Sequence, residues 1–363
     1  MQPSTSIDSS VEAASRAEGA LEAAASAGCD ALVAKSPPTV RWLLCGRGRP
    51  VDAAAPVAAY IVVLHARARY VLFPDIEAPR VAAEERFQEL GYEPVPFPWF
   101  AGPEAALAEL LDGSEAVGDG DAEAALAPLR RNLSEDDRER YRAAGRDAGD
   151  AMVEALDALT PELSEQDAAA ELAYRCRRRG LFPGVLLVAG EERQPVHRHP
   201  LPTGAPLGRH CLLAVTVERD GLYSSLTRLA SFGPAPARLA ELLRLTAEID
   251  AAVLRASRPG RTLGEVFDDL AAAYAERGFP EEWRRHHQGG LTGYKGRETF
   301  AVPGEPTPVP PSAAFAWNPS ITGGAKSEDT AIVTDDGLEL VTRTPALPEL
   351  HLDGVPRPTI VEL

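Results

Sequence analysis

The second half of the chain contains an internal repeat, which limits its possible folds more than any other feature. Residues 133–183 predict a long helix, a break at a proline, a second helix starting at Ser164, and a stop at a glycine. Residues 234–280 repeat this order, with the second helix starting at Thr262. Ser and Thr are preferred helix N-caps and glycine often follows a helix, so both copies carry the same start and stop signals.

Each copy is followed by strand-like sequence that opens with histidines. These are "HRHP" at 197–200 after the first copy and "RHHQGG" at 285–290 after the second. The order predicts two helix–helix–sheet units of about 100 residues each, related by a pseudo-twofold axis. We expect their sheets to pack around a shared cleft, with the two histidine groups facing each other across it.

The first part of the chain predicts a separate α/β domain. Residues 1–17 are small and polar and are expected to be disordered, and residues 18–131 alternate apolar strand-like and amphipathic helical stretches. The expected strands are 40–46, 58–66, 68–75, 93–100 and 115–120, and the expected helices are 78–91, 103–113 and 121–133. The remaining residues, 132–363, form the domain that contains the repeat.

Composition and charge narrow the function classes. The chain has 363 residues, of which 45% are apolar, and 37 basic against 54 acidic residues give a net charge of -17. This charge repels nucleic acid and anionic membranes and favours a small-molecule or short-peptide partner. No apolar run long enough to span a membrane and no secretory signal is seen, so we expect a cytoplasmic protein. The four scattered cysteines are expected to be reduced.

The duplication and its motifs resemble the pita-bread fold of the methionine aminopeptidase, aminopeptidase P and creatinase clan. The resemblance covers nearly the whole chain, because aminopeptidase P and creatinase also carry an α/β domain ahead of the catalytic domain. It implies an α/β N-terminal domain of the creatinase/prolidase type, over 18–131, followed by an α+β pita-bread domain over 132–363. It also implies a homodimer in which the N-terminal domain of one chain closes the cleft of the other.

The peptidases of this clan bind two metal ions through two Asp, one His and two Glu side chains. At the matching positions this chain has Ala214, Ser225, His287, Asn318 and Glu328. One histidine and one carboxylate cannot offset the charge of two divalent ions, so no metal and no other cofactor is expected. Purified protein should then hold no stoichiometric Mn, Co, Fe or Zn.

Creatinase-like members of the clan also lack the metals, and the local sequence resembles them. His287, Arg297 and Glu298 in "HHQGGLTGYKGRETF" match the creatinase segment, and Tyr223 aligns with a substrate-facing tyrosine. His199 falls where creatinase keeps its acid/base histidine. Thr227 and Asn318 depart from creatinase, so creatine itself is a poor candidate substrate.

These residues form the candidate site, and for each of them a purely structural role is an alternative to the functional role. His199, Glu328 and His287 are the catalytic candidates, with His199 as the proton-transfer residue because imidazole titrates near neutrality. The substrate-binding candidates are Arg297, whose planar fork suits a carboxylate, and the neutral side chains Tyr223, Asn318 and Gln288. Each could instead be a satisfied core or surface residue.

The resulting hypothesis is a metal-independent, creatinase-like enzyme of the Xaa-Pro aminopeptidase family. It would cleave a C–N bond in a small amino-acid-like or amidine substrate by acid/base chemistry. Three alternatives stay open: a catalytically inactive peptide-binding or scaffold protein, an Xaa-Pro-type aminopeptidase, and an enzyme of elimination or cyclisation. The presence of His199, Arg297 and Glu328 together favours an enzyme, a hydrolase acting on C–N bonds, because a binding module needs no titratable base beside an anion-binding group.

Overall fold

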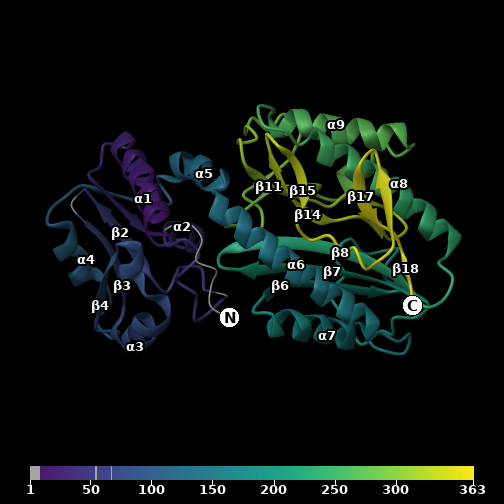
Figure 1. Ribbon diagram of the computed structural model, residues 1–363, viewed down its shortest axis with the longest axis horizontal. Coiled ribbons are helices and arrows are strands. Elements are labelled where there is room, and N and C mark those ends of the chain that lie inside the picture. Colours follow the sequence, from purple (N-terminus) through teal and green to yellow (C-terminus); the bar gives the residue numbers. More distant parts are fainter. Residues whose placement is uncertain (1–8, 54, 67) are drawn as a thin grey trace. The chain divides into compact units, whose positions relative to one another are not determined.

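A boundary after Asn132 divides the chain into two units, Met1–Asn132 and Leu133–Leu363. The computed structural model describes residues 9–53, 55–66 and 68–363 (Figure 1). The first unit is an α/β N-terminal domain of the prolidase type and the second is a pita-bread domain, as expected. Within the described residues, no helix is both long and apolar enough to cross a bilayer.

A five-stranded sheet with the order β4-β3-β2-β1-β5 forms the centre of the first unit (Figure 1). Its strands are β1 (Ala31–Ala34), β2 (Ile61–His65), β3 (Ala68–Pro74), β4 (Glu93–Phe97) and β5 (Ala116–Gly118). Helix α4 (Glu104–Leu111) packs on the face of this sheet that carries Val33, Ile61 and Val63. Helix α1 (Ser9–Ser26) packs its buried alanines against β1 and β2. The unit also contains α2 (Pro37–Leu43), α3 (Ala78–Arg80) and α5 (Glu123–Arg131).

Several sequence-based expectations for this unit are wrong. Residues 9–17 are not disordered but belong to α1, because its small side chains fit a helix packed closely on the sheet; residues 1–8 lie outside the described part. The expected strand at 40–46 is largely the helix α2, which begins at two prolines. A short, mostly apolar segment that is buried does not distinguish a strand from a buried helix. The expected helix at 78–91 is broken by Arg86, whose φ is 46°.

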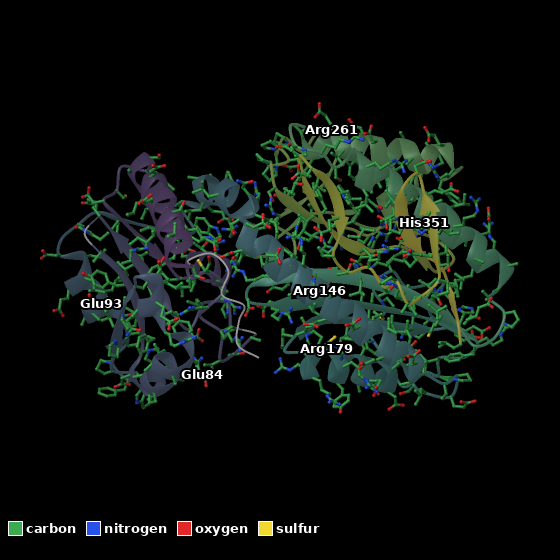
Figure 2. All side chains as sticks on the ribbon, in the orientation of Figure 1. Glu84, Glu93, Arg146, Arg179, Arg261 and His351 are labelled. Atoms are coloured by element: carbon green, nitrogen blue, oxygen red, sulfur yellow. The ribbon has the colours of Figure 1, made fainter. Side chains whose placement is uncertain are left out.

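The first half of the second unit is a helix pair packed on a four-stranded sheet. Its helices are α6 (Glu135–Asp157) and α7 (Glu165–Arg178), and the sheet has the order β18-β8-β7-β6. Arg179, at the end of α7, pairs with Glu154 of α6 at 2.7 Å and ties the two helices together (Figure 2). The strands are β6 (Phe182–Gly190), β7 (His210–Arg219), β8 (Leu222–Ser231) and β18 (Val361–Glu362).

The second half repeats this plan with α8 (Ala237–Ala256) and α9 (Leu263–Glu276). They cover a sheet of order β10-β9-β11-β14-β15, and the two sheets lie between the two helix pairs (Figure 1). Its strands are β9 (Gly289–Thr292), β10 (Thr299–Phe300), β11 (Ala313–Trp317), β14 (Asp329–Thr334) and β15 (Gly337–Leu340). Short strands complete the unit: β12 (Ser320–Ile321), β13 (Ala325–Lys326), β16 (Glu349–Leu352) and β17 (Val355–Pro358).

Matching helix ends confirm the predicted repeat. Ser164 and Thr262 each cap their helix, and each forms a capping box with an acidic residue three positions on. Gly180 and Gly278 follow α7 and α9 with φ of 73° and 85°, a left-handed conformation that glycine adopts without strain. Both copies therefore place their sheets after the same helix–helix unit.

Candidate functional site

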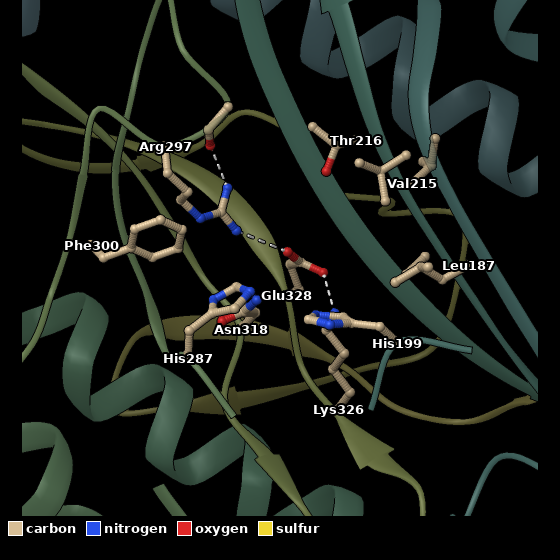
Figure 3. Close-up of a pocket in the computed structure, with 13 residues that line it drawn as sticks. Leu187, His199, Val215, Thr216, His287, Arg297, Phe300, Asn318, Lys326 and Glu328 are labelled. Atoms are coloured by element: carbon tan, nitrogen blue, oxygen red, sulfur yellow. Dashed lines mark hydrogen bonds and ion pairs between the residues drawn. The ribbon is translucent and has the colours of Figure 1, made fainter. Parts of the chain in front are cut away.

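A pocket of about 330 Å³ opens in the second unit and takes its walls from both sheets (Figure 3). Val185 and Leu187 of β6 and part of β7 form one wall. The histidine turns, the loop before β10 and the segment around Glu328 form the other. The lining residues are Val185, Leu187, His199, Ala214, Val215, Thr216, His287, Gly296, Arg297, Phe300, Asn318, Lys326 and Glu328.

Glu328 lies at the point where the two sheets meet. The Thr227 backbone amide donates to the carbonyl of Glu328 at 3.0 Å, and the Thr227 hydroxyl donates to its carboxylate at 2.7 Å. Two cations also reach this carboxylate: Lys326 at 3.1 Å and Arg297 at 3.5 Å. Burial alone would raise the pKa of Glu328, but Lys326 and Arg297 outweigh it and lower the pKa below its usual value.

A buried ion network fixes the strand that follows Glu328. Arg357 lies 2.7 Å from Asp250 and 2.9 Å from Asp329, and Arg228 lies 2.8 Å from Asp329. The four residues come from β17, α8, β14 and β8. Because each of the two carboxyl groups lies beside a guanidinium group, the network can remain buried while holding β14 in register beside the pocket.

Two polar atoms at the pocket lack partners among the described residues. Asn318 is 2% exposed and its Oδ1 is buried without a hydrogen bond, as is Nε of Arg297. Burial lowers the pKa of Arg297, and the negative charge of Glu328 opposes this shift. The guanidinium of Arg297 therefore stays charged near neutral pH. Unmet buried polar atoms are costly, so both are suited to bonding a ligand in the pocket.

The histidines of the two repeats meet beside the pocket, as the sequence predicts. His199 and His286 approach with their Nε2 atoms 2.9 Å apart, and the rings of His286 and His287 stack with centroids 4.5 Å apart. Burial, followed by the charges of Arg297 and Lys326 and the His199 ring, lowers the pKa of His287 to about 4. Burial and Lys326 also lower the pKa values of His199 and His286, so all three rings are neutral at pH 7.

Five of the seven predicted site residues line this pocket: His199, His287, Arg297, Asn318 and Glu328. Gln288 does not, because it is buried below the turn, where it accepts from the Tyr274 hydroxyl at 2.8 Å and donates to the His286 carbonyl at 2.6 Å. Tyr223 is also absent from the lining; its backbone amide donates to the Gly293 carbonyl at 3.1 Å.

Sequence reasoning missed Lys326 and Thr216 as lining residues. Lys326 stands two positions before Glu328, a spacing that puts two side chains on one side of an extended segment. The partners of the Glu328 carboxylate are Thr227, Lys326 and Arg297, and His199 is not among them. The neighbour of His199 is instead His286.

The donor set does not fit the two metal ions that the clan resemblance implies. Ala214 has no donor, and the Ser225 hydroxyl is hydrogen-bonded to that of Thr216 at 2.8 Å. The carboxylate of Glu328 is already shared by two cations. Divalent pairs of this kind need several carboxylates, whereas the lining of this pocket supplies Glu328, so the residues present do not fit such ions.

An α/β domain followed by a duplicated helix–helix–sheet domain, with a pocket between its sheets, defines a protein of the pita-bread clan. The sequence profile of metallopeptidase family M24 matches residues 139–335, more than half of the chain, and the chain belongs to that family. This confirms the resemblance seen in the sequence.

Individual relatives agree with the family assignment. The "Probable dipeptidase PepE" of Mycobacterium tuberculosis is 26% identical over 229 residues, 61% of this chain and 60% of that protein. The match thus spans less than two thirds of the length of this relative. An Xaa-Pro dipeptidase from Bacillus anthracis superposes with a TM-score of 0.74 at 18% identity, covering 92% of this chain and 98% of its own. Dipeptidase PepE from Mycobacterium ulcerans gives 0.72 at 20% identity, covering 98% and 99%. At these identities the structures share the fold.

Proposed function

We propose that this chain is a metal-independent, creatinase-like enzyme that cleaves a C–N bond in a small amino-acid-like or amidine substrate. The observation that carries the proposal is the environment of Glu328. Its carboxylate is held by Lys326 at 3.1 Å and Arg297 at 3.5 Å, so two side-chain cations stand in a pocket whose donor set does not suit a metal pair. The proposed enzyme uses these fixed charges to bind and orient its substrate.

The charges favour a ligand with an anionic group. Lys326 and Arg297 outnumber the single carboxylate of Glu328, and the three neutral imidazoles leave an excess of one positive charge. A substrate carboxylate would complete the balance and would accept a hydrogen bond from Arg297 Nε, whereas Asn318 Oδ1 would accept one from an N–H group of the substrate. A pocket of about 330 Å³ suits an amino-acid derivative or a short peptide.

In the proposed hydrolysis, a water oxygen forms a bond to the substrate carbon and the C–N bond breaks, with its electron pair passing to nitrogen. His199 accepts a proton from the attacking water and delivers a proton to the departing nitrogen, so the protein gains and loses none. His287, in the glycine-rich turn, contacts the substrate. His199 is assigned the transfer because it lines the pocket and is hydrogen-bonded to another ring, that of His286.

Two alternatives have support of their own. The names of the dipeptidase relatives favour an Xaa-Pro-type peptidase, with a short peptide as substrate. The substitution of metal-ligand positions by Ala214, Ser225 and Asn318 favours a catalytically inactive peptide-binding protein. Elimination or cyclisation would use the same groups. We also propose a homodimer and, from four dispersed free cysteines, a cytoplasmic location.

The test is ligand discovery followed by turnover measured without metal. Dipeptides, amino acids and amidino-amino acids would be screened by thermal shift with the full chain, and binders assayed by mass spectrometry in excess chelator. We expect turnover that the chelator leaves unchanged. Binding without turnover would support the inactive alternative, and turnover only with added divalent metal would overturn metal independence.

A variant of Arg297 tests the anchoring role. Arg297→Lys keeps the charge but loses the two-pronged contact, so we expect affinity to fall by about 10- to 100-fold with a smaller change in the rate of bound substrate. Arg244→Lys, on the exposed face of α8, is the matched control and should have no effect. Equal affinity in both variants would contradict a carboxylate held by Arg297.

A further inference from the structure

We infer that His199, His286 and His287 form a binding site for a single transition-metal ion that inhibits the proposed reaction. One ring nitrogen of each histidine lies within 4.8 Å of the others. This inference goes beyond the proposed function and differs from the expectation that the chain holds no transition metal. That expectation rests on the five positions that bind metal in the peptidases, and of these only His287 belongs to the three-histidine cluster.

The geometry of the three rings suits one small ion. The Nε2 atoms of His199 and His286 are 2.9 Å apart, and the ring centroids of His199 and His287 are 5.3 Å apart. With metal–nitrogen bonds of about 2.0–2.1 Å, a tetrahedral ion separates its ligand nitrogens by about 3.3 Å. The three nitrogens are therefore within small side-chain rotations of a tripod.

The chain connectivity makes the tripod stiff on one side. His286 and His287 are consecutive, and the backbone below them is held by Gln288, which donates to the carbonyls of His286 and Trp283 at 2.6 and 3.1 Å. His199 approaches from the loop between β6 and β7 in the other repeat. An ion bound by all three would link the two repeats across the pocket.

Nitrogen chemistry selects the class of metal. Imidazole suits Zn²⁺, Cu²⁺ and Ni²⁺, whereas Mg²⁺, Ca²⁺ and Mn²⁺ prefer oxygen ligands. The nearby carboxylate of Glu328 is held by Lys326, Arg297 and Thr227, so it is not placed as a ligand. Three histidines with a fourth position facing the pocket match an open zinc site.

Two further features affect how tightly the three histidines would bind a metal ion. His286 has a buried Nδ1 without a partner among the described residues, so one nitrogen of its ring stays unsatisfied whichever tautomer it adopts. Lys326 acts electrostatically on all three rings and opposes a second cation there. Lys326→Met should therefore strengthen metal binding, an effect that exposed surface histidines would not show.

The test is a titration of Zn²⁺ into the full, chelator-treated chain by calorimetry. We expect one ion per chain. His286→Gln should weaken binding by at least about 100-fold, since loss of even an outer-shell partner costs about 10- to 100-fold. His351→Gln is the control: this residue lies on β16, where it pairs with Glu349 (Figure 2), and its loss should change nothing. Circular dichroism would verify that each variant folds.

Cu²⁺ provides an independent readout, because its electron paramagnetic resonance spectrum reports coordinated nitrogens. Loss of the multi-nitrogen pattern in both His199→Gln and His286→Gln would support the site. Undiminished Zn²⁺ affinity in these variants, or no binding by the wild-type chain at micromolar concentrations, would overturn it. Failure of the wild-type chain to bind Zn²⁺ would overturn the metal site but would not contradict the proposed metal-free reaction. Inhibition of turnover by Zn²⁺ that His286→Gln relieves would support both the metal site and the reaction.

Discussion

Lys326 Nζ lies 3.1 Å from a carboxylate oxygen of Glu328, and both side chains are almost fully buried. Such a pair is held in place by its surroundings, because either charge alone would be costly in this environment. The same carboxylate also takes a contact from Arg297. Glu328 is thus the centre of the electrostatic arrangement in the pocket.

Removing Lys326 should destabilise the protein. Lys326→Met leaves Glu328 with Arg297 and Thr227 as partners, so we expect the free energy of unfolding to fall by about 1–3 kcal/mol. Urea denaturation would measure this. Adding Glu328→Gln should restore part of the loss, because the neutral amide no longer needs a cation. A double variant that is as unstable as the sum of both single changes would argue against the pairing.

His199→Asn should lower the rate and leave substrate affinity nearly unchanged. The asparagine keeps a polar side chain but cannot exchange a proton, so turnover should drop by about two to four orders of magnitude. The matched control is His197→Asn, an exposed histidine two residues away that does not line the pocket. Full activity in His199→Asn would overturn its assigned role as proton-transfer residue.

The buried carboxyl of Asp250 should make stability depend on pH. Burial, opposed by Arg357, raises the pKa of Asp250 to about 7, above the value of about 3.9 expected in the unfolded chain. A raised pKa means that the folded state binds the proton more tightly. The contribution of Asp250 to stability is therefore complete below about pH 4 and is lost as pH rises through about 7.

Asp250→Asn would test this, since the amide has no proton to lose. Melting temperatures measured from pH 5 to pH 8 should fall more steeply for the wild type than for the variant. Parallel curves would show that Asp250 does not titrate in this range. Arg357 accompanies Asp250 in the same network, so the comparison is made on the slope with pH and not on absolute stability.

Exposed aromatic side chains of the first unit lead to a prediction about assembly. Trp99 and Phe100 are 62% and 76% exposed and contact each other edge to face. Adjacent exposed aromatics are uncommon on monomers, so we expect a homodimer that covers them. Sedimentation at micromolar concentration should give a species of twice 38.7 kDa, and Trp99→Ser with Phe100→Ser should weaken it. A 38.7 kDa species in the wild type would contradict the prediction.

Local signals in the sequence were sufficient for the repeated domain. Ser164 and Thr262 cap the second helix of each copy, and Gly180 and Gly278 end it, because capping and helix termination depend on residues within a few positions. The meeting of His199 with His286 and His287 also followed from the order of the repeat. In the first unit the same reasoning failed at α2, whose short, mostly apolar segment is too brief to show a helical period.

Tertiary structure alone decided which polar residues reach the pocket. Gln288 is adjacent to His287 in sequence, yet Gln288 is buried beneath the turn and His287 faces the pocket. Lys326 becomes part of the site only because the bridge between Thr227 and Glu328 joins strands 101 residues apart. Local sequence fixes how a segment folds, but the charge balance at Glu328 depends on long-range packing that brings both sheets together, and a single sequence does not encode those distances in any local pattern.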